Sequence, residues 1–316
     1  MGILSGLGHW LGSSPPDEAL RQAVDRAVET VDPLLKTVSG YERKLGPVVS
    51  RALAYCEALA ADIPGPVAVN PPAFSADPLV HALFAGAGDI GEMLGKSREV
   101  RDFFADPGNG GEGEFYALLG MRRREKEVTG RALNGDTVRT GVPQRLLYFA
   151  DHTLRELGSR HETTRRRLQA TAFDSLARGF AACVAELRQE RNEARTAWSL
   201  DRAPATAGRA ERRQALEERQ RLAIASLAPA AVLDDFAAWL AAPQERLYLK
   251  PTVVTVDRMG VIRPDPDAAG NFSTLKLPEL VGRDRRLWTV LVARISRRDA
   301  QEALLRQEQA NRYLII

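Results

Sequence analysis

The chain has 316 residues, of which 44% are hydrophobic and 27% are charged, and its formal net charge is +3. This composition is typical of a soluble globular protein with room for one large domain or two ordinary ones. No apolar run approaches the roughly 20 residues of a membrane-spanning helix, and the first residues lack the pattern of a secretory signal. Cys56 and Cys183 lie far apart in the sequence, so we expect reduced, buried thiols and a cytoplasmic protein. The high Ala and Arg content is compatible with a GC-rich bacterial genome.

The charge is distributed unevenly along the chain. Residues 1–120 hold 9 Lys and Arg against 16 Asp and Glu, whereas residues 121–226 hold 22 against 14. Residues 227–316 are nearly balanced, with 13 against 11. An acidic first third followed by a basic middle predicts two electrostatically distinct regions, which can attract each other or attract charged partners.

Residues 1–16 are predicted to form an amphipathic segment. In "MGILSGLGHWLG" the large apolar side chains recur at the spacing of one helix face, and the other face carries glycine, serine and histidine. Such a pattern is typical of segments that sense lipid packing, although about 18 Å of helix is too short to cross a bilayer. We expect contact with a membrane surface or a partner, and the alternative is docking onto the protein's own core. The contact residues would be Ile3, Leu4, Leu7, Trp10 and Leu11.

Residues 17–110 are predicted to form an acidic helical region. A helix begins at the Ser14 cap with two prolines and two acidic residues in its first turn, and a second helix covers about 47–62. A proline-rich loop precedes two shorter helices near 78–84 and 88–104. The glycine-rich stretch "ADPGNGGEGE" then marks a boundary.

Residues 111–316 are predicted to form an α+β region with a helical insertion at 152–243. Asn134-Gly135-Asp136 indicates a β-hairpin over 121–150, protruding because its first arm is polar on both faces. Pro143 indicates an edge strand or a bulge. Apolar residues at steps of three and four from Leu154 to Ala197 predict one long coiled-coil-like helix. A return helix from about 211 and another from Pro229 would complete an antiparallel hairpin.

Strand patterns resume after residue 247 and end in a final amphipathic helix from about 297. Because strands flank the helical block on both sides, we expect one antiparallel sheet built from 121–150 and 246–295. The alternative is two separate β-hairpin subdomains joined by the helical stalk. The predicted fold class is therefore α+β and mostly helical, with a helical N-terminal region, an antiparallel β platform and a projecting coiled-coil-like helical hairpin.

Two stretches invite a chemical interpretation that their spacing does not support. His152 and His161, with carboxylates beside them, would point to opposite sides of the predicted helix, so a metal site is disfavoured. In "GAGDIGEMLGKS" the glycine spacing departs from that of a phosphate-binding loop. We assign no catalytic, cofactor-binding or metal-ligating residue and expect no cofactor.

Two arginine clusters form a candidate basic patch. Solvated charge is the simplest interpretation, and contact with anionic lipid requires nothing more than charge. Nucleic-acid binding is disfavoured because no aromatic residues are interleaved with the arginines. The clusters consist of Arg122, Arg123 and Arg124 on the hairpin and Arg165, Arg166 and Arg167 on the long helix.

These patterns favour a non-catalytic scaffold or adaptor over an enzyme. The reasons are the long helical seam, the charge separation and the lack of a catalytic constellation at readable spacing. We expect a protein partner or self-association, with peripheral attachment to the inner membrane through the N-terminal segment. The alternatives are an enzyme whose residues converge only in the fold, and a nucleic-acid-binding protein that uses the arginine clusters.

Overall fold

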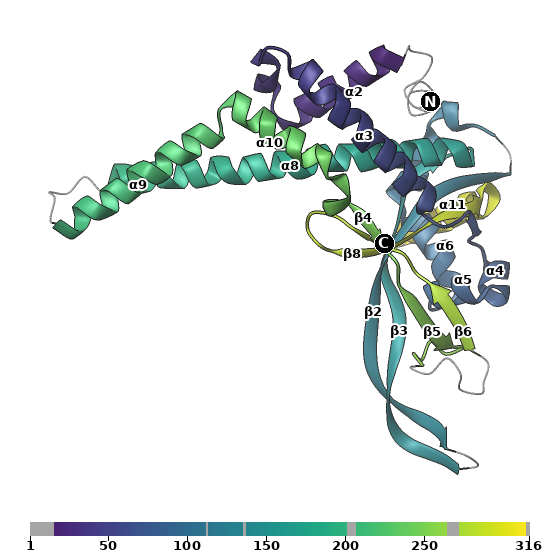
Figure 1. Ribbon diagram of the computed structural model, residues 1–316. Helices are drawn as coiled ribbons and strands as arrows, with labels where there is room; N and C mark the ends of the chain where they lie inside the picture. Colours follow the sequence, from purple (N-terminus) through teal and green to yellow (C-terminus); the bar gives the residue numbers. More distant parts are fainter. Residues whose placement is uncertain (1–15, 112, 135–136, 201–206, 264–271, 314–316) are drawn as a thin grey trace. The chain divides into compact units, whose positions relative to one another are not determined.

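The computed structural model describes residues 16–111, 113–134, 137–200, 207–263 and 272–313 (Figure 1). The chain divides into two compact units. The helical unit comprises Met1–Ala58 and Gln169–Leu247, and the sheet unit comprises Leu59–Leu168 and Tyr248–Ile316. These bounds differ from the predicted regions 17–110 and 111–316, because residue contacts group the first helices with the later helical segment. The α+β class, with N-terminal helices and an antiparallel sheet, is confirmed.

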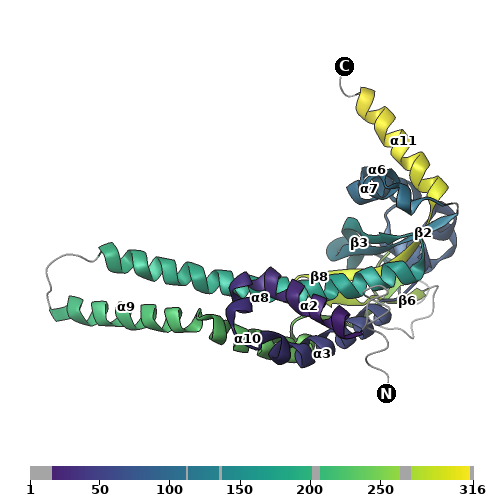
Figure 2. The ribbon, with the colours of Figure 1, turned by 90° about the horizontal axis from the view of Figure 1, so that it is seen from above.

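The helical unit is built from long helices joined by short turns. Aromatic stacking fixes α8 against α10: the Phe180 and Phe236 rings lie 5.0 Å apart, and Trp239 Nε1 donates to the Leu176 carbonyl at 3.1 Å. Beyond this core, α9 runs back antiparallel to the outer part of α8, as predicted (Figures 1 and 2). The helices are α2 (Pro16–Val31), α3 (Tyr41–Asp62), α8 (His161–Leu200), α9 (Ala207–Ser226) and α10 (Pro229–Ala241), with short 3-10 turns at Pro33–Thr37 and Pro243–Glu245.

The sheet unit contains one six-stranded sheet in the order β3-β2-β8-β7-β4, with β1 paired parallel to β8. All other neighbours are antiparallel, and the early strand β2 pairs with the late strand β8 along Glu114–Met121. The two halves of the sequence therefore form one sheet rather than two separate hairpins. The strands are β1 (Val67–Ala68), β2 (Glu114–Asn134), β3 (Thr137–Gly158), β4 (Tyr248–Lys250), β7 (Glu279–Val281) and β8 (Leu287–Ser296), and β5 (Val253–Asp257) and β6 (Phe272–Lys276) form a small second sheet.

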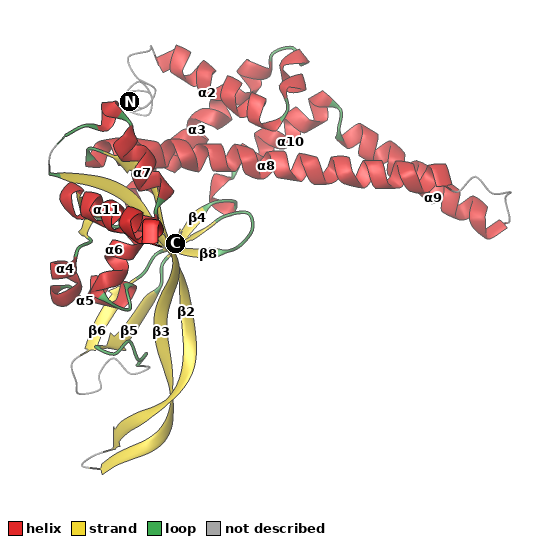
Figure 3. Cartoon of the chain, turned by 180° about the vertical axis from the view of Figure 1, so that it is seen from behind, coloured by secondary structure: helices red, strands yellow, loops and turns green. Residues whose placement is uncertain are grey.

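Helices cover one face of this sheet, as Figure 3 shows. The close packing of α6 on α11 requires a glycine, since a Cβ at Gly95 would lie 2.7 Å from the Ala303 carbonyl oxygen. The opposite face holds a smaller apolar cluster in which Ile63 and Leu168 meet Val292. The covering helices are α4 (Pro71–Ala76), α5 (Pro78–Leu83), α6 (Ala87–Lys96), α7 (Arg98–Ala105) and α11 (Arg297–Tyr313), with a 3-10 turn at Pro107–Asn109.

The predicted start of the long helix at Leu154 is wrong, because residues 137–158 form β3 and α8 begins at His161. Two β-bulges explain the misleading pattern. One extra residue on β3 lies between the pairs Leu118↔Arg155 and Tyr116↔Gly158, and Glu156 takes a positive φ of 52° there. The bulge allows Leu154 and Leu157, three residues apart, both to be buried, so a bulged strand imitates helical spacing.

Other predicted elements are confirmed with shifted bounds. The helix predicted from Pro47 begins at Tyr41 and contains that proline, and the helix predicted over 88–104 is divided at Ser97, which caps α7 through its hydroxyl. The proline-rich stretch contains β1 and α4, and β7 was not predicted. Among the described residues no single helix is long and apolar enough to span a membrane, and only Glu217–Ser226 and Pro229–Ala241 together, bent by 65°, reach that composition.

Candidate functional site

The five predicted contact residues of the N-terminal segment, Ile3, Leu4, Leu7, Trp10 and Leu11, lie outside the described residues. Their role as a membrane or partner contact therefore stays a prediction.

The first arginine cluster lies at the base of the β2–β3 hairpin. Arg123 Nε donates to Glu279 Oε1 at 3.0 Å, and this carboxylate is almost fully buried and also accepts from Thr252 at 2.9 Å. Arg122 lies 3.9 Å from Asp151, and Arg124 is exposed. One member of the cluster thus compensates a buried charge, and Arg124 points into solvent.

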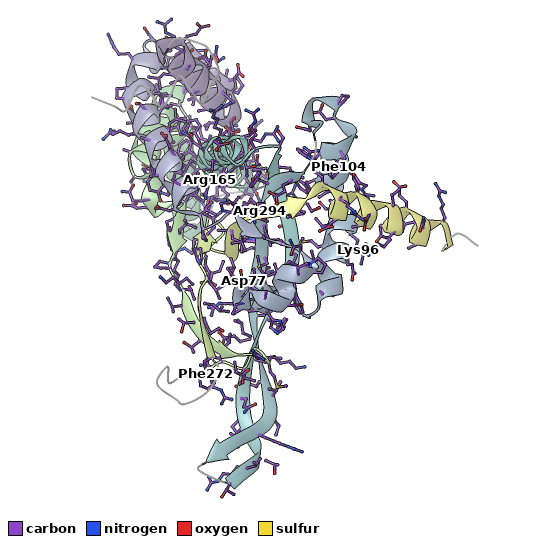
Figure 4. The ribbon with its side chains drawn as sticks, turned by 90° about the vertical axis from the view of Figure 1, so that its right-hand side faces the viewer. Asp77, Lys96, Phe104, Arg165, Phe272 and Arg294 are labelled. Atoms are coloured by element: carbon purple, nitrogen blue, oxygen red, sulfur yellow. The ribbon has the colours of Figure 1, made fainter. Side chains whose placement is uncertain are left out.

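Two arginines of the second cluster, Arg165 and Arg167, donate hydrogen bonds to backbone carbonyls of the sheet unit. Figure 4 labels Arg165. The Arg165 guanidinium donates to the carbonyls of Ala60, Ile63 and Gly65 near the end of α3, with 2.7 Å to Ile63. Ala60 lies in the last turn of α3, whose carbonyls have no intrahelical partner, and Ile63 and Gly65 follow the helix directly. Arg167 donates to the Leu157 carbonyl. Two of the three arginines are therefore held by backbone carbonyls, and the role of the cluster with Arg166 as a basic patch stays a prediction.

His161 contacts the same guanidinium group that binds the carbonyls after α3. Arg165 Nε donates to His161 Nε2 at 3.0 Å, which requires a neutral ring with its proton on Nδ1. Burial, and then the nearby Arg165 charge, lower the pKa of His161 below its ordinary value. Burial also lowers the pKa of Arg165. His152 lies elsewhere, on β3, and among the described residues no three His, Cys, Asp or Glu side chains gather as a metal site would need.

The outer part of the β2–β3 hairpin forms what we call the ribbon arm, Arg124–Asn134 paired with Thr137–Tyr148. Met121 is the last residue of β2 that pairs with β8 (Figure 1), and on the other side Arg145–Leu147 of β3 meet the segment 260–262. Among the described residues, the rest of the ribbon arm is two strands wide. Most of its described side chains are exposed on both faces. Pro143 lies on the edge strand β3, and the bulge at Gly141, with φ of 81°, is adjacent, as the sequence predicted.

The two faces of the ribbon arm differ in charge. Since side chains alternate across a strand, the pairing Arg124↔Tyr148 and Lys126↔Leu146 places both cations on one face, and Arg139 joins them beyond the bulge. No carboxylate occurs among the described residues of that face. The other face is mixed, with Glu125 bound by Arg123 and Arg145 at 3.2 Å each. On one face of the ribbon arm, therefore, all charged side chains among the described residues are cations.

A cavity of about 530 Å³ lies beside β3, bordered by α6 and the start of α7. Two stretches that looked unrelated in sequence meet here, since "GEMLGKS" supplies one wall and His152–Arg155 the other. Two ion pairs lie in its lining: Lys96 binds Glu92, whose pKa this hydrogen bond lowers, and Arg155 binds Glu99. The mixed lining suits a polar ligand or peptide rather than a strongly charged one.

His152 is oriented toward this cavity by its surroundings. Its ring stacks on Phe84 at 4.8 Å, and Nε2 donates to the Leu83 carbonyl at 2.7 Å. The preceding residue, Asp151, takes a positive φ of 57° in the second bulge of β3. Sequence spacing could not reveal this arrangement, because the bulge that aims His152 depends on pairing with β2.

Comparison of the chain with protein-family models, with curated proteins and with solved structures gives no match in any of the three.

Proposed function

We propose that the protein is a non-catalytic scaffold or adaptor, and that the ribbon arm is one of its contact elements. The observation that supports this most directly is the ribbon arm itself. An isolated two-stranded ribbon is only marginally stable in water, yet β2 continues for 13 residues beyond its last pairing with β8, from Arg122 to Asn134, paired with β3. A surface exposed on both faces contributes little to folding, so its length is better explained by binding.

The charge of the ribbon arm suggests the chemistry of the partner. Its acid-free face with Arg124, Lys126 and Arg139 complements an acidic protein surface, and complementary charge raises the association rate and sets specificity. The same pattern would serve self-association, because the first 120 residues of this chain are acidic.

A photo-crosslinking side chain at the exposed Thr129 tests the proposal in cells, with the same group at the exposed Ala310 on α11 as a control. We expect a discrete protein adduct from Thr129 that disappears when Arg124→Glu and Lys126→Glu reverse the basic face. An adduct twice the mass of the chain identifies a second copy as the partner. An adduct that persists after charge reversal, or one that nuclease removes, contradicts the proposal.

We also propose that the N-terminal segment attaches the protein to the cytoplasmic face of the inner membrane. Support comes from the spacing of its apolar side chains, and burying Trp10 with several aliphatic residues contributes roughly 6–10 kcal/mol before the cost of ordering the segment. Trp10→Ser in the full chain should reduce co-sedimentation with anionic liposomes. Equal sedimentation of the parent and the variant excludes the attachment role.

A further inference from the structure

A second cavity lies next to the one that contains His152, and both follow the outer edge of β3. The second has a volume of about 630 Å³ and is bordered by α5 and by the turn at Asp257–Gly260. Ala85 and Phe149 line both cavities. Figure 4 labels Lys96 from the first cavity and Asp77 from the second. We call the two cavities together the edge groove.

The edge groove follows the backbone of β3 rather than one face of the sheet. In a strand, successive side chains point to opposite faces. The first cavity is nevertheless lined by four consecutive residues, His152–Arg155, and the second by four others, Leu146–Phe149. Consecutive residues can share a cavity when it lies over the strand edge. The groove therefore borders β3 from Leu146 to Arg155.

The backbone of β3 offers hydrogen-bonding groups to this groove. Next to it, a short extended segment already pairs with the same edge: Leu147 N donates to the Gly260 carbonyl and Ile262 N donates to the Arg145 carbonyl, both at 2.8 Å. The alternation of an antiparallel strand then turns the N–H and C=O of Phe149 outward as well. Among the described residues, no strand pairs with β3 on this side beyond Leu147.

The lining of the groove changes along its length. The part beside α6 and α7 carries equal numbers of acidic and basic residues, with Lys96 and Arg155 each bound to a glutamate. The part beside α5 combines the aromatic Tyr148 and Phe149 and the exposed Met259 with polar side chains, among them Asp77, His81 and Asp257. Balanced charge does not favour a polyanion such as nucleic acid, and a strand edge beside two cavities favours an extended peptide instead.

We propose that the edge groove binds an extended peptide segment of a partner protein, which adds as a strand to β3 at Phe149. Main-chain hydrogen bonds would supply affinity, and the two cavities would select side chains, which is the general logic of strand addition. Each cavity combines polar and apolar lining, so each would accept a side chain of the peptide that has an apolar body and a polar tip. The groove borders only Leu146–Tyr148 of the ribbon arm, so this proposal does not rest on the basic face.

The test uses the full chain and a displayed library of random peptides of about ten residues, the length of β3 that borders the groove. Ala85 is exposed and lines both cavities, so Ala85→Trp fills the groove without entering the core. Ala310→Trp, at an exposed position on α11, is the matched control. We expect enriched peptides whose affinity falls by about tenfold or more in the Ala85→Trp protein, as the loss of two main-chain hydrogen bonds implies.

Amide hydrogen exchange provides the readout specific to strand addition. Bound peptide should slow exchange of the outward-facing Phe149 amide, and Ala310→Trp should bind the peptide as the parent does. Enriched peptides that bind the Ala85→Trp protein equally well, or a library that yields none, would overturn the proposal. Dimers that Ala85→Trp abolishes, without peptide binding, would also overturn it and assign the edge to a second copy. Charge reversal at Arg139, on the part of the ribbon arm outside the groove, should leave peptide binding unchanged, which separates this test from that of the ribbon arm.

Discussion

Replacing Arg165 by methionine should destabilise the sheet unit, because the guanidinium caps the end of α3. It donates to the carbonyls of Ala60, Ile63 and Gly65, and its Nε donates to His161. Methionine keeps the apolar stem and removes all of these donors. The half-buried site lets water reach part of the vacated space, so the carbonyls are left incompletely rather than wholly unpaired.

The magnitude follows from these contacts. An intramolecular hydrogen bond contributes about 1 kcal/mol net, and a charged donor contributes somewhat more. With two well-formed carbonyl contacts and one long contact of 3.4 Å to Gly65, we expect a loss of about 2–3 kcal/mol. Arg165→Lys should fall between the parent and the methionine variant, since an ammonium lacks the planar fork that reaches several acceptors.

Urea denaturation followed by circular dichroism measures the effect, with hydrogen exchange at the end of α3 as a local readout because two compact units can unfold separately. Arg101→Met is the control, as it removes the same charge at an exposed position of the sheet unit. If Arg165→Met and Arg101→Met unfold at the same denaturant concentration as the parent, the capping argument is refuted. A loss of lipid or nucleic-acid binding without loss of stability would favour the basic-patch interpretation instead.

Three further outcomes are expected. Phe180→Ala should cost about 3–4 kcal/mol in thermal or denaturant melts, because it deletes a buried ring stacked on Phe236; a melt that matches the parent contradicts the observed packing. The pKa of His161 lies below its ordinary value of 6.5, so the unfolded state binds the proton more tightly and stability should fall as pH drops below about 6.5. His161→Gln should flatten this part of the stability profile, and an unchanged slope would assign it to other groups. Burial raises the pKa of the Cys56 thiol to about 12, so a thiol reagent should modify the half-buried Cys183 in the native protein and Cys56 only after unfolding.

The sequence was sufficient to predict local structure wherever caps, prolines and turn residues act on their neighbours. Helices α2, α10 and α11 begin close to where these signals place them, and β2 and β3 pair as the predicted hairpin. Strand pairing between segments far apart in the sequence could not be predicted as well. Residues 114–120 of β2 were not predicted as strand, since their partner in the sheet, β8, lies more than 160 residues later.

The candidate sites also depend on contacts between residues far apart in the sequence, and these contacts could not be predicted. The individual arginines could be identified, but whether each points into solvent depends on tertiary partners. Arg123 is held by Glu279 and Arg165 by the end of α3, contacts that span 156 and about 100 residues. The edge groove could not be predicted from the sequence for the same reason. Its walls come from two helices and a bulged strand whose sequences carry no common spacing.

The discontinuity of the two units has a consequence for the order of events during synthesis. Each unit combines an early and a late segment of the chain. The strand β2 cannot complete its pairing until β8, at Leu287–Ser296, has left the ribosome, and α2 must wait for α8 and α10. Contacts of such long range slow folding and prolong the exposure of apolar surface. We expect the nascent chain to remain unfolded through most of its translation and to depend on chaperones until its last helices emerge.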